Sequence, residues 1–364
     1  MRKFPFIDAL RGLAILGVVY VHAGLWGEPA SSWLIRFAVN GRRGVQLFFV
    51  VSALTLFLSM DNRRKREKNP IRNFFIRRFF RIAPLFYCGI IAYTLIDGFS
   101  PRYGAPDGIE WWYLPLTALF INGWSPETIT SVVPGGWAIA VEMTFYLVFP
   151  LLYRRLHSIG ATLCFVGAAL VFDFVLSSAL LPLLSQQYPA GQQTLVDDFF
   201  YLWFFAQLPT FGMGVLAYHI FRRQQVCVDS RKGLVLIFFS LYLFVLLLKL
   251  NPYENIFYAG VFAVFSLALH QYPAILFVNP LTQWLGRLSF SIYITHFAIL
   301  KLLHAIFVDG FVFQGDFGSL AAFLLVLLLS VGVSVLTYRF IEQPGISLGH
   351  RLIEKLERYS PAAS

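Results

Sequence analysis

The chain has 364 residues, of which 58% are hydrophobic, 18% are aromatic and only 13% are charged. Its mean hydropathy of +0.67 and its repeated apolar runs of about 20 residues exclude an ordinary soluble domain and predict several membrane spans. The net charge of +10 would suit nucleic-acid binding in a soluble protein. Here the Lys and Arg residues cluster in short connections between apolar runs, which instead indicates cytoplasmic loops.

The first apolar segment, Phe6–Trp26, carries Arg11 and His22. Eleven residues at about 100° each end about 20° past three full turns, so the two side chains share one helix face about 16 Å apart. Ionisable residues inside a span are costly and mark functional sites, which makes His22 a candidate catalytic residue. The alternative is that both side chains reach headgroups at opposite membrane surfaces. Because Asp8 and Arg11 interrupt the apolar run, we predict a retained span rather than a cleaved signal peptide, with Met1–Lys3 in the cytoplasm.

Ten spans and a short re-entrant segment account best for the remaining apolar runs. The longer runs are Gly44–Met60, Ile82–Phe99, Trp137–Tyr153, Gly160–Leu184, Phe199–Phe221, Gly233–Leu250, Asn255–Gln271, Leu285–Phe307 and Gly318–Phe340. Trp111–Trp124 is too short for a comfortable crossing. Counting it as a span would place several basic clusters outside, whereas ten spans place them inside together with both termini. Trp137–Tyr153 is also short and contains a charge, so two segments compete for the re-entrant assignment.

The connection between the second and third spans is the most basic stretch of the chain. Its basic residues are Arg63, Arg64, Lys65, Arg66, Lys68, Arg72, Arg77, Arg78 and Arg81. This connection is predicted to be cytoplasmic, which leaves the Arg36–Arg43 connection outside as an exception. Arg77, Arg78 and Arg81 have helical spacing, and guanidinium groups bind phosphates through paired hydrogen bonds. They are therefore candidates for binding a phosphorylated donor, with an orientation signal or anionic-lipid contact as the alternative.

Glu142 lies in a span that enters from outside near Trp137. His22 is about 23 Å from the cytoplasmic start of its own helix, so the two residues are predicted at similar depth. A carboxylate at that depth would orient the imidazole or raise its basicity, and we predict that His22 and Glu142 form a catalytic pair. The alternative for Glu142 is an interfacial carboxylate at the start of its helix.

Two other ionisable residues near the end of the chain are predicted to be structural. His296 stands among serine, threonine and tyrosine residues of its span, where a hydrogen-bonding role is more common than catalysis. Glu342, two residues before Pro344, is interpreted as a residue of the cytoplasmic interface.

Three cysteines, Cys88, Cys164 and Cys227, show no metal-type spacing and predict neither a disulfide framework nor a metal site. No internal repeat is evident. The chain is interpreted as one membrane domain over residues 1–345, followed by a short basic cytoplasmic tail over residues 346–364.

Six stretches in order resemble motifs of the membrane acyltransferase-3 family, the bacterial O-acyltransferases of surface polysaccharides and some small molecules. They are Arg11 with His22, GVQLFFVVSAL (44–54), Arg78 with Arg81, GWAIAVEMTFYLVFP (136–150), LGRLSFSIYITHF (285–297) and YRFIEQP (338–344). The resemblance covers essentially the whole chain. Departures occur at Ala53, Leu54, Ala138, Met143 and Ala298, and none removes a candidate site residue.

The resemblance implies an all-α polytopic membrane bundle that transfers an acyl group, usually acetyl, from cytoplasmic acyl-CoA to a hydroxyl, here one of a surface or exported carbohydrate. It implies the bacterial cytoplasmic membrane, with lipid and the hydroxyl acceptor as partners. On this interpretation Arg11, Arg77, Arg78 and Arg81 hold the CoA phosphates, and His22 acts as general base or transient acyl carrier with Glu142 as its orienting partner.

A transporter or flippase for a glycan or lipid-linked precursor is the main alternative. Arg11, His22 and Glu142 would then form a proton relay. The lack of an internal repeat weakens this alternative, because many transporters have two-fold internal symmetry.

Overall fold

The computed structural model describes residues 4–224, 229–250, 255–307 and 313–359. The predictions that concern Met1–Lys3, Cys227 and the last five residues of the tail lie outside these ranges. Cys88 and Cys164 are both free thiols. Within the described residues the chain is helical and forms no β-strand, which confirms the predicted all-α bundle.

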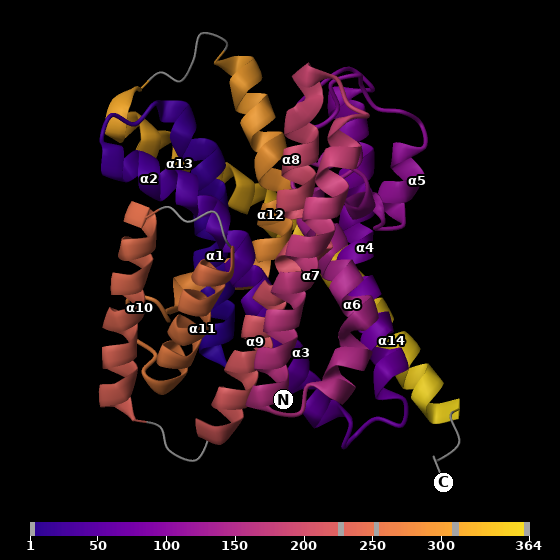
Figure 1. The fold of residues 1–364 in the computed structure, drawn as a ribbon, viewed down its shortest axis with the longest axis vertical. Helices are drawn as coiled ribbons and strands as arrows, with labels where there is room; N and C mark the ends of the chain where they lie inside the picture. Colours follow the sequence, from indigo (N-terminus) through magenta and orange to yellow (C-terminus); the bar gives the residue numbers. More distant parts are fainter. Residues whose placement is uncertain (1–3, 225–228, 251–254, 308–312, 360–364) are drawn as a thin grey trace.

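The helices pack side by side into one bundle (Figure 1). They are α1 (Pro5–Ala23), α2 (Ser32–Asn40), α3 (Gly44–Arg63), α4 (Pro70–Asp97), α5 (Tyr113–Ala118), α6 (Gly136–Arg155), α7 (Ile159–Ser185), α8 (Gln193–Leu202), α9 (Phe204–Gln224), α10 (Ser230–Leu250), α11 (Asn255–Gln271), α12 (Pro280–Ile306), α13 (Gly315–Thr337) and α14 (Gln343–Tyr359). A π-helical turn, Tyr338–Glu342, joins the last two.

The predicted segments of spanning length are confirmed as apolar helices. Nine stretches of the described chain are long and apolar enough to cross a membrane, and α11, with 17 residues, is a shorter apolar helix. Trp111–Trp124 forms only the short α5 and a single turn at Asn122–Trp124. By contrast, α6 is a 20-residue helix. The incomplete segment is therefore Trp111–Trp124.

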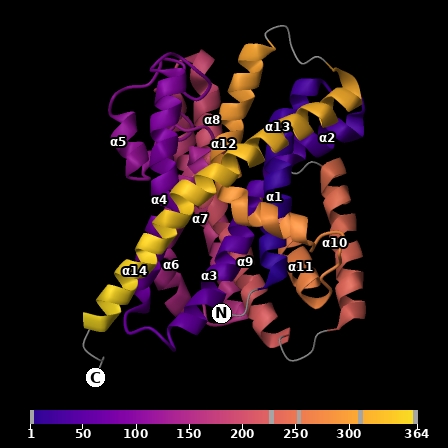
Figure 2. The same cartoon turned by 180° about the vertical axis from the view of Figure 1, so that it is seen from behind.

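The start of α1 and the end of α14 lie in the lower half of Figure 1, where the connection between α3 and α4 also lies. This arrangement fits an even number of crossings. Seen from behind, α13 and α14 form one long diagonal across the bundle (Figure 2). The assignment of this end to the cytoplasm stays a prediction from the charge distribution.

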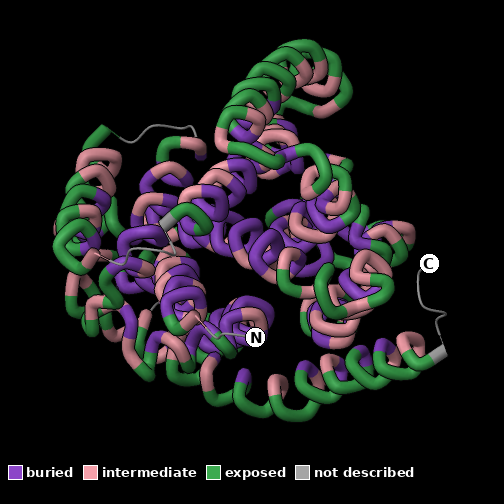
Figure 3. The backbone as a smooth tube through the Cα atoms, turned by 90° about the horizontal axis from the view of Figure 1, so that it is seen from below, coloured by how far each residue is buried: buried purple, intermediate pink, exposed green. Residues whose placement is uncertain are grey.

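Buried residues gather at the centre of the bundle and exposed residues lie around it (Figure 3). The exposed faces of the outer helices carry large apolar side chains, such as Phe174 on α7, Phe238 on α10 and Leu328 on α13. Apolar side chains facing outward are expected where lipid, rather than water, surrounds a protein.

Helix α4 begins at Pro70, twelve residues before the predicted start of the third span at Ile82. Proline is well tolerated in the first helical turn because its missing N–H would have no intrahelical partner there. The apolar run marks only the membrane-embedded part, and the helix continues into the basic stretch. As a result Arg77, Arg78 and Arg81 all lie on one continuous helix.

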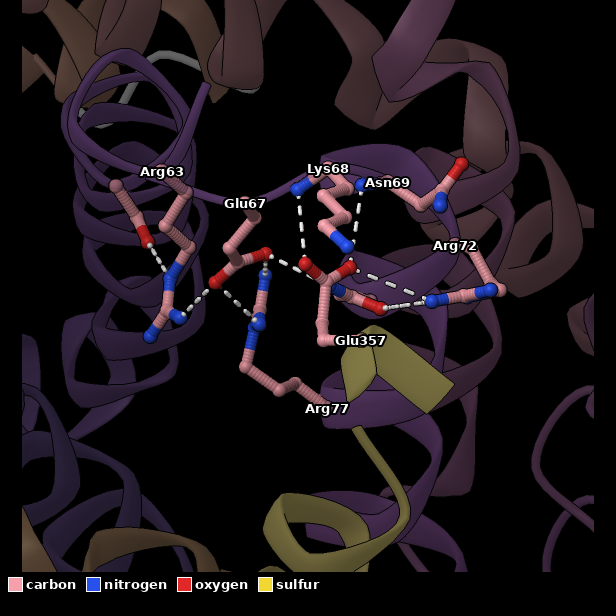
Figure 4. Close-up of polar contacts among 9 residues, drawn as sticks. Arg63, Glu67, Lys68, Asn69, Arg72, Arg77 and Glu357 are labelled. Carbon is pink, nitrogen blue, oxygen red and sulfur yellow. Dashed lines mark hydrogen bonds and ion pairs between the residues drawn. The ribbon is translucent and has the colours of Figure 1, made fainter. Parts of the chain in front are cut away.

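The terminal helix α14 packs along the start of α4, although its residues were predicted as a tail. The Glu357 carboxylate accepts hydrogen bonds from the backbone N–H groups of Lys68 and Asn69, at 2.8 and 3.2 Å (Figure 4). A carboxylate is favourable there because the N-terminus of a helix carries partial positive charge. This contact attaches the end of the chain to the basic connection.

The Arg36–Arg43 connection, the exception to the positive-inside pattern, holds its last arginine inside the protein. Arg43 is 1% exposed, and its guanidinium donates to Tyr201 and Asn255 at 2.7 and 2.5 Å. Because the Arg43 guanidinium is buried and hydrogen-bonded within the protein, it does not act as an exposed basic residue of a loop. It therefore has little bearing on the orientation of the chain in the membrane.

Helices α1 and α12 run in parallel and touch through two glycines. A Cβ atom on Gly12 would lie 2.0 Å from the Thr282 carbonyl oxygen, and one on Gly286 would lie 1.7 Å from the Asp8 carbonyl oxygen. Real Cβ atoms cannot approach so closely, so only glycine permits this backbone contact. The crossing sets how far the later residues of the two helices lie from each other.

Candidate active site

A cavity of about 90 Å³ lies between α1, α3, α4, α6 and α12. We call it the arginine cavity. Its charged and hydroxyl-bearing lining residues are Arg11, Ser52, Arg78, Arg81, Glu142, Tyr146, Ser289 and Tyr293. Three guanidinium groups and one carboxylate give the lining an excess of positive charge, which suits an anionic ligand.

Glu142 is held inside this cavity by two hydroxyl groups. Ser52 of α3 donates to its carboxylate at 2.6 Å, and Tyr146, one turn further along α6, donates at 2.5 Å. Hydrogen bonds from two different helices fix the position of the carboxylate. The same cavity is lined by Arg11, Arg78 and Arg81.

Arg11 of α1 and Arg78 of α4 both line the cavity. Arg11 pairs with Asp8 at 3.6 Å and contacts Thr55 at 3.5 Å. The Arg78 guanidinium lies 5.5 Å from the Tyr146 ring centroid, and its Nε atom is buried with no hydrogen-bond partner among the described residues. An arginine with an unused donor is suited to binding an incoming oxyanion.

Arg77 does not line the cavity, in contrast to the other predicted donor-binding arginines. Its Nη1 and Nη2 atoms donate to the Glu67 carboxylate at 2.9 and 3.1 Å (Figure 4). Burial alone would raise the pKa of Glu67, but hydrogen bonds from Arg63 and Arg77 outweigh this effect and leave its pKa below the ordinary value. Spacing suggested a common face for Arg77 and Arg81, yet the nearby carboxylate draws Arg77 away.

His22 lies on the last turn of α1, and its side chain is exposed. Its ring packs against Phe297 at 4.4 Å and against His296 at 5.5 Å between ring centroids. No hydrogen bond joins His22 to Glu142 within the described residues, so the predicted pair is not formed directly.

His296, which the sequence analysis set aside, is the ionisable residue that the structure brings to His22. It is completely buried, and its Nδ1 atom lies 3.1 Å from the carbonyl oxygen of Ile292. A signal for this neighbour exists in the sequence. His22 follows Gly12 by ten residues, and His296 follows Gly286 by ten residues. Parallel helices that cross at the two glycines bring both histidines about 15 Å beyond the crossing.

Glu342 also differs from its prediction, because it is 1% exposed rather than an interface residue. It closes the π-helical turn Tyr338–Glu342, and its carboxylate accepts a hydrogen bond from Ser291 at 3.0 Å. A π-helical turn shifts the direction in which the following side chains point. The turn directs Glu342 toward α12 instead of the membrane surface.

No group of three or more His, Cys, Asp and Glu side chains gathers at metal-binding distance in the described ranges.

A family model described as an acyltransferase domain matches residues 4–339. The chain is 26% identical, over 94% of its length, to the O-acetyltransferase OatA of Staphylococcus aureus (strain NCTC 8325). It is 24% identical, over 99% of its length, to a provisionally named O-acetyltransferase of Staphylococcus aureus (strain MRSA252). These matches cover 57% and 60% of the two relatives, so the chain spans less than two thirds of either. No solved structure matches the chain.

Proposed function

Because the chain belongs to the acyltransferase-3 family and is a multi-pass membrane acyltransferase, we propose that it transfers an acyl group from cytoplasmic acyl-CoA to a carbohydrate hydroxyl. Acetyl is the proposed acyl group, since the named relatives are O-acetyltransferases. The proposed acceptor is a surface or exported carbohydrate, and the proposed location is the bacterial cytoplasmic membrane.

The observation that carries this proposal is the placement of the arginine cavity and His22 along one helix. Arg11 lines the cavity near the start of α1, and His22 ends the same helix about 16 Å further on. Arg11, Arg78 and Arg81 would bind the phosphates of the donor, and its extended arm would follow α1 toward His22. Glu142 balances part of the arginine charge within the cavity, which replaces its expected role beside His22.

The proposed chemistry at His22 is proton removal from the acceptor hydroxyl. The oxygen attacks the thioester carbonyl carbon, the carbon–sulfur bond breaks, and the departing CoA thiolate takes up the proton from the imidazolium. In the second form of the proposal, the acyl group passes first to the His22 ring and then to the hydroxyl. Both forms need an accessible imidazole, as His22 provides.

Membership of an acyltransferase family favours this function over the transporter alternative. A transporter that uses Arg11, His22 and Glu142 as a proton relay would have no need for acyl-CoA. Stabilisation of the purified protein by CoA therefore separates the two functions.

The test is release of free CoA from acetyl-CoA by the full chain in lipid nanodiscs. We expect slow thiol release by the wild type and none by His22→Ala, because that variant lacks the proposed base or carrier. His350→Ala is a matched control, since His350 is exposed on α14. Turnover retained by His22→Ala would remove His22 from the mechanism, and the absence of both turnover and CoA binding in the wild type would contradict the donor assignment.

A further inference from the structure

The side chain of His296 has one nitrogen with a partner and one without. Its Nδ1 atom lies 3.1 Å from the Ile292 carbonyl oxygen, which can only accept a hydrogen bond, so Nδ1 carries the hydrogen. Nε2 therefore presents a lone pair. This atom is buried and has no hydrogen-bond partner among the described residues, an arrangement that costs free energy unless a donor reaches it.

The ring packed against His296 that has a hydrogen to offer is that of His22. Phe297 lies against both rings, at 4.2 Å from His296 and 4.4 Å from His22. The nearby Tyr293 hydroxyl already donates to the Gly135 carbonyl oxygen at 2.8 Å. The ring centroids of His22 and His296 are 5.5 Å apart and 38° from parallel, so the His22 ring lies directly beside the ring that carries Nε2.

We propose that His296 is the positioning residue for His22. In this arrangement the Ile292 carbonyl accepts from His296 Nδ1–H, and His296 Nε2 accepts from an N–H of His22. The other His22 nitrogen is then left as a lone pair facing the acceptor hydroxyl. The proposal rests on the catalytic role of His22 proposed above, and it assigns to a neutral histidine the part first expected of Glu142.

A buried histidine nitrogen without a partner is not by itself evidence of such a role, as His270 shows. Its Nε2 is also buried and unpaired within the described chain, but its neighbours are the aromatic rings of Phe4, Phe6 and Phe221. The difference at His296 is the adjacent imidazole of a candidate catalytic residue. His270→Leu is therefore the matched control, because it removes a half-buried histidine ring whose buried Nε2 is unpaired within the described chain and whose ring neighbours do not include His22.

The experiment compares turnover of acetyl-CoA by four proteins in nanodiscs: wild type, His296→Leu, His296→Gln and His270→Leu. Leucine keeps the apolar volume and removes the acceptor, whereas glutamine can both donate to Ile292 and accept from His22. We expect kcat to fall by about tenfold or more in His296→Leu, with KM for acetyl-CoA unchanged. His296→Gln is expected to recover most of the loss, and His270→Leu to retain wild-type kcat.

A second measurement does not depend on turnover. In protein labelled with ¹⁵N-histidine, the His22 signals are assigned by their loss in His22→Ala. We expect one tautomer of His22 in the wild type and a mixture in His296→Leu. Identical His22 signals in both proteins, or equal losses of kcat in the leucine and glutamine variants, would overturn the proposal. If His22 has one tautomer in the wild type and a mixture in His296→Leu, but the wild type never releases CoA, the proposed function would be contradicted instead.

Discussion

Two adjacent arginines of α4, Arg77 and Arg78, have opposite surroundings, and this difference predicts opposite effects on donor binding. Arg78 lines the arginine cavity, and its Nε donor has no partner in the described part of the chain, whereas Arg77 is held by both oxygens of Glu67. A lost hydrogen bond to a charged group costs about 1.5–3 kcal/mol, equivalent to a tenfold or larger loss of affinity. We expect Arg78→Met to raise KM for acyl-CoA by at least about tenfold and Arg77→Met to change it by less than about threefold. Equal changes in the two variants would show that the cavity does not bind the donor.

The Glu67 carboxylate predicts an acid-sensitive contribution to stability. Its pKa is lowered in the folded protein, because hydrogen bonds from Arg63 and Arg77 outweigh the effect of burial. Its stabilisation is therefore present above the unfolded-state pKa of about 4.3 and is lost as pH falls through the folded-state value. We expect Glu67→Gln to lower Tm in detergent at pH 7 and to narrow its gap from the wild type below about pH 4. A gap that is constant across this range would show that the charged form of Glu67 is not what stabilises the fold.

Most of the candidate residues were predictable because each is an ionisable side chain within or beside an apolar run. His22, Glu142 and the arginines stand out for that reason alone. Their partners were not predictable, since counting residues along a helix estimates depth but not which neighbouring helix supplies the contact. Glu142 accepts hydrogen bonds from the hydroxyls of Ser52 and Tyr146. These residues are uncharged, so a search for ionisable residues in apolar runs does not identify them.

At the scale of helices, the contact of α1 with α12 predicts a selective effect of a single methyl group. Gly286→Ala would place a Cβ atom 1.7 Å from the Asp8 carbonyl oxygen, whereas Gly332 on α13 has open space around its Cβ position. Alanine is favoured over glycine in a helix by about 1 kcal/mol, so Gly332→Ala should be neutral or stabilising. We expect Gly286→Ala to lower Tm and to abolish CoA release, because the helices must separate and carry His22 away from His296. Wild-type turnover in Gly286→Ala would show that this crossing does not set the geometry of the site.

The apolar runs predicted which segments span the membrane, but they did not predict where the helices begin and end. The start of α4 and the whole of α14 consist of residues too polar for the hydrocarbon, and hydropathy cannot distinguish a polar helix from a polar loop. The actual ends depend on tertiary contacts, such as Glu357 at the first turn of α4. Such contacts involve residues nearly 300 positions apart, which no local pattern reveals.

At the scale of the whole molecule, basic and acidic connections separate along the long axis of the bundle. Basic residues gather in the connection between α3 and α4 and at the adjoining ends of α9 and α10, which lie in the lower half of Figure 1. The connection between α4 and α5, in the upper half, contains Asp107 and Glu110. The positive-inside rule then predicts a cytoplasmic C-terminus. We expect green fluorescent protein fused after residue 364 to fluoresce, and alkaline phosphatase fused at the 186–189 connection to be active. Phosphatase activity from the C-terminal fusion would reverse the assigned orientation and move the donor site to the wrong side.

The family was recognisable from six short motifs because they lie in the same order along nearly the whole chain, and the match over residues 4–339 confirms that identification. Their order carries more information than any single motif. None of them describes the three-dimensional pairing of the helices that carry the first and fifth motifs, α1 and α12.

The equal ten-residue intervals from Gly12 to His22 and from Gly286 to His296 have a consequence for insertions and deletions. One residue added to either interval would turn its histidine by about 100° and advance it by about 1.5 Å, which separates the two rings. The same addition to both intervals turns both histidines together and leaves them at the same height, although no longer face to face. Insertion of seven residues into both intervals, close to two full turns, would bring the two histidines face to face again about 10 Å further along the helices. The two glycine-to-histidine intervals therefore depend on each other. A relative with a different interval in one helix must have a matching change in the other helix to keep its histidines in contact.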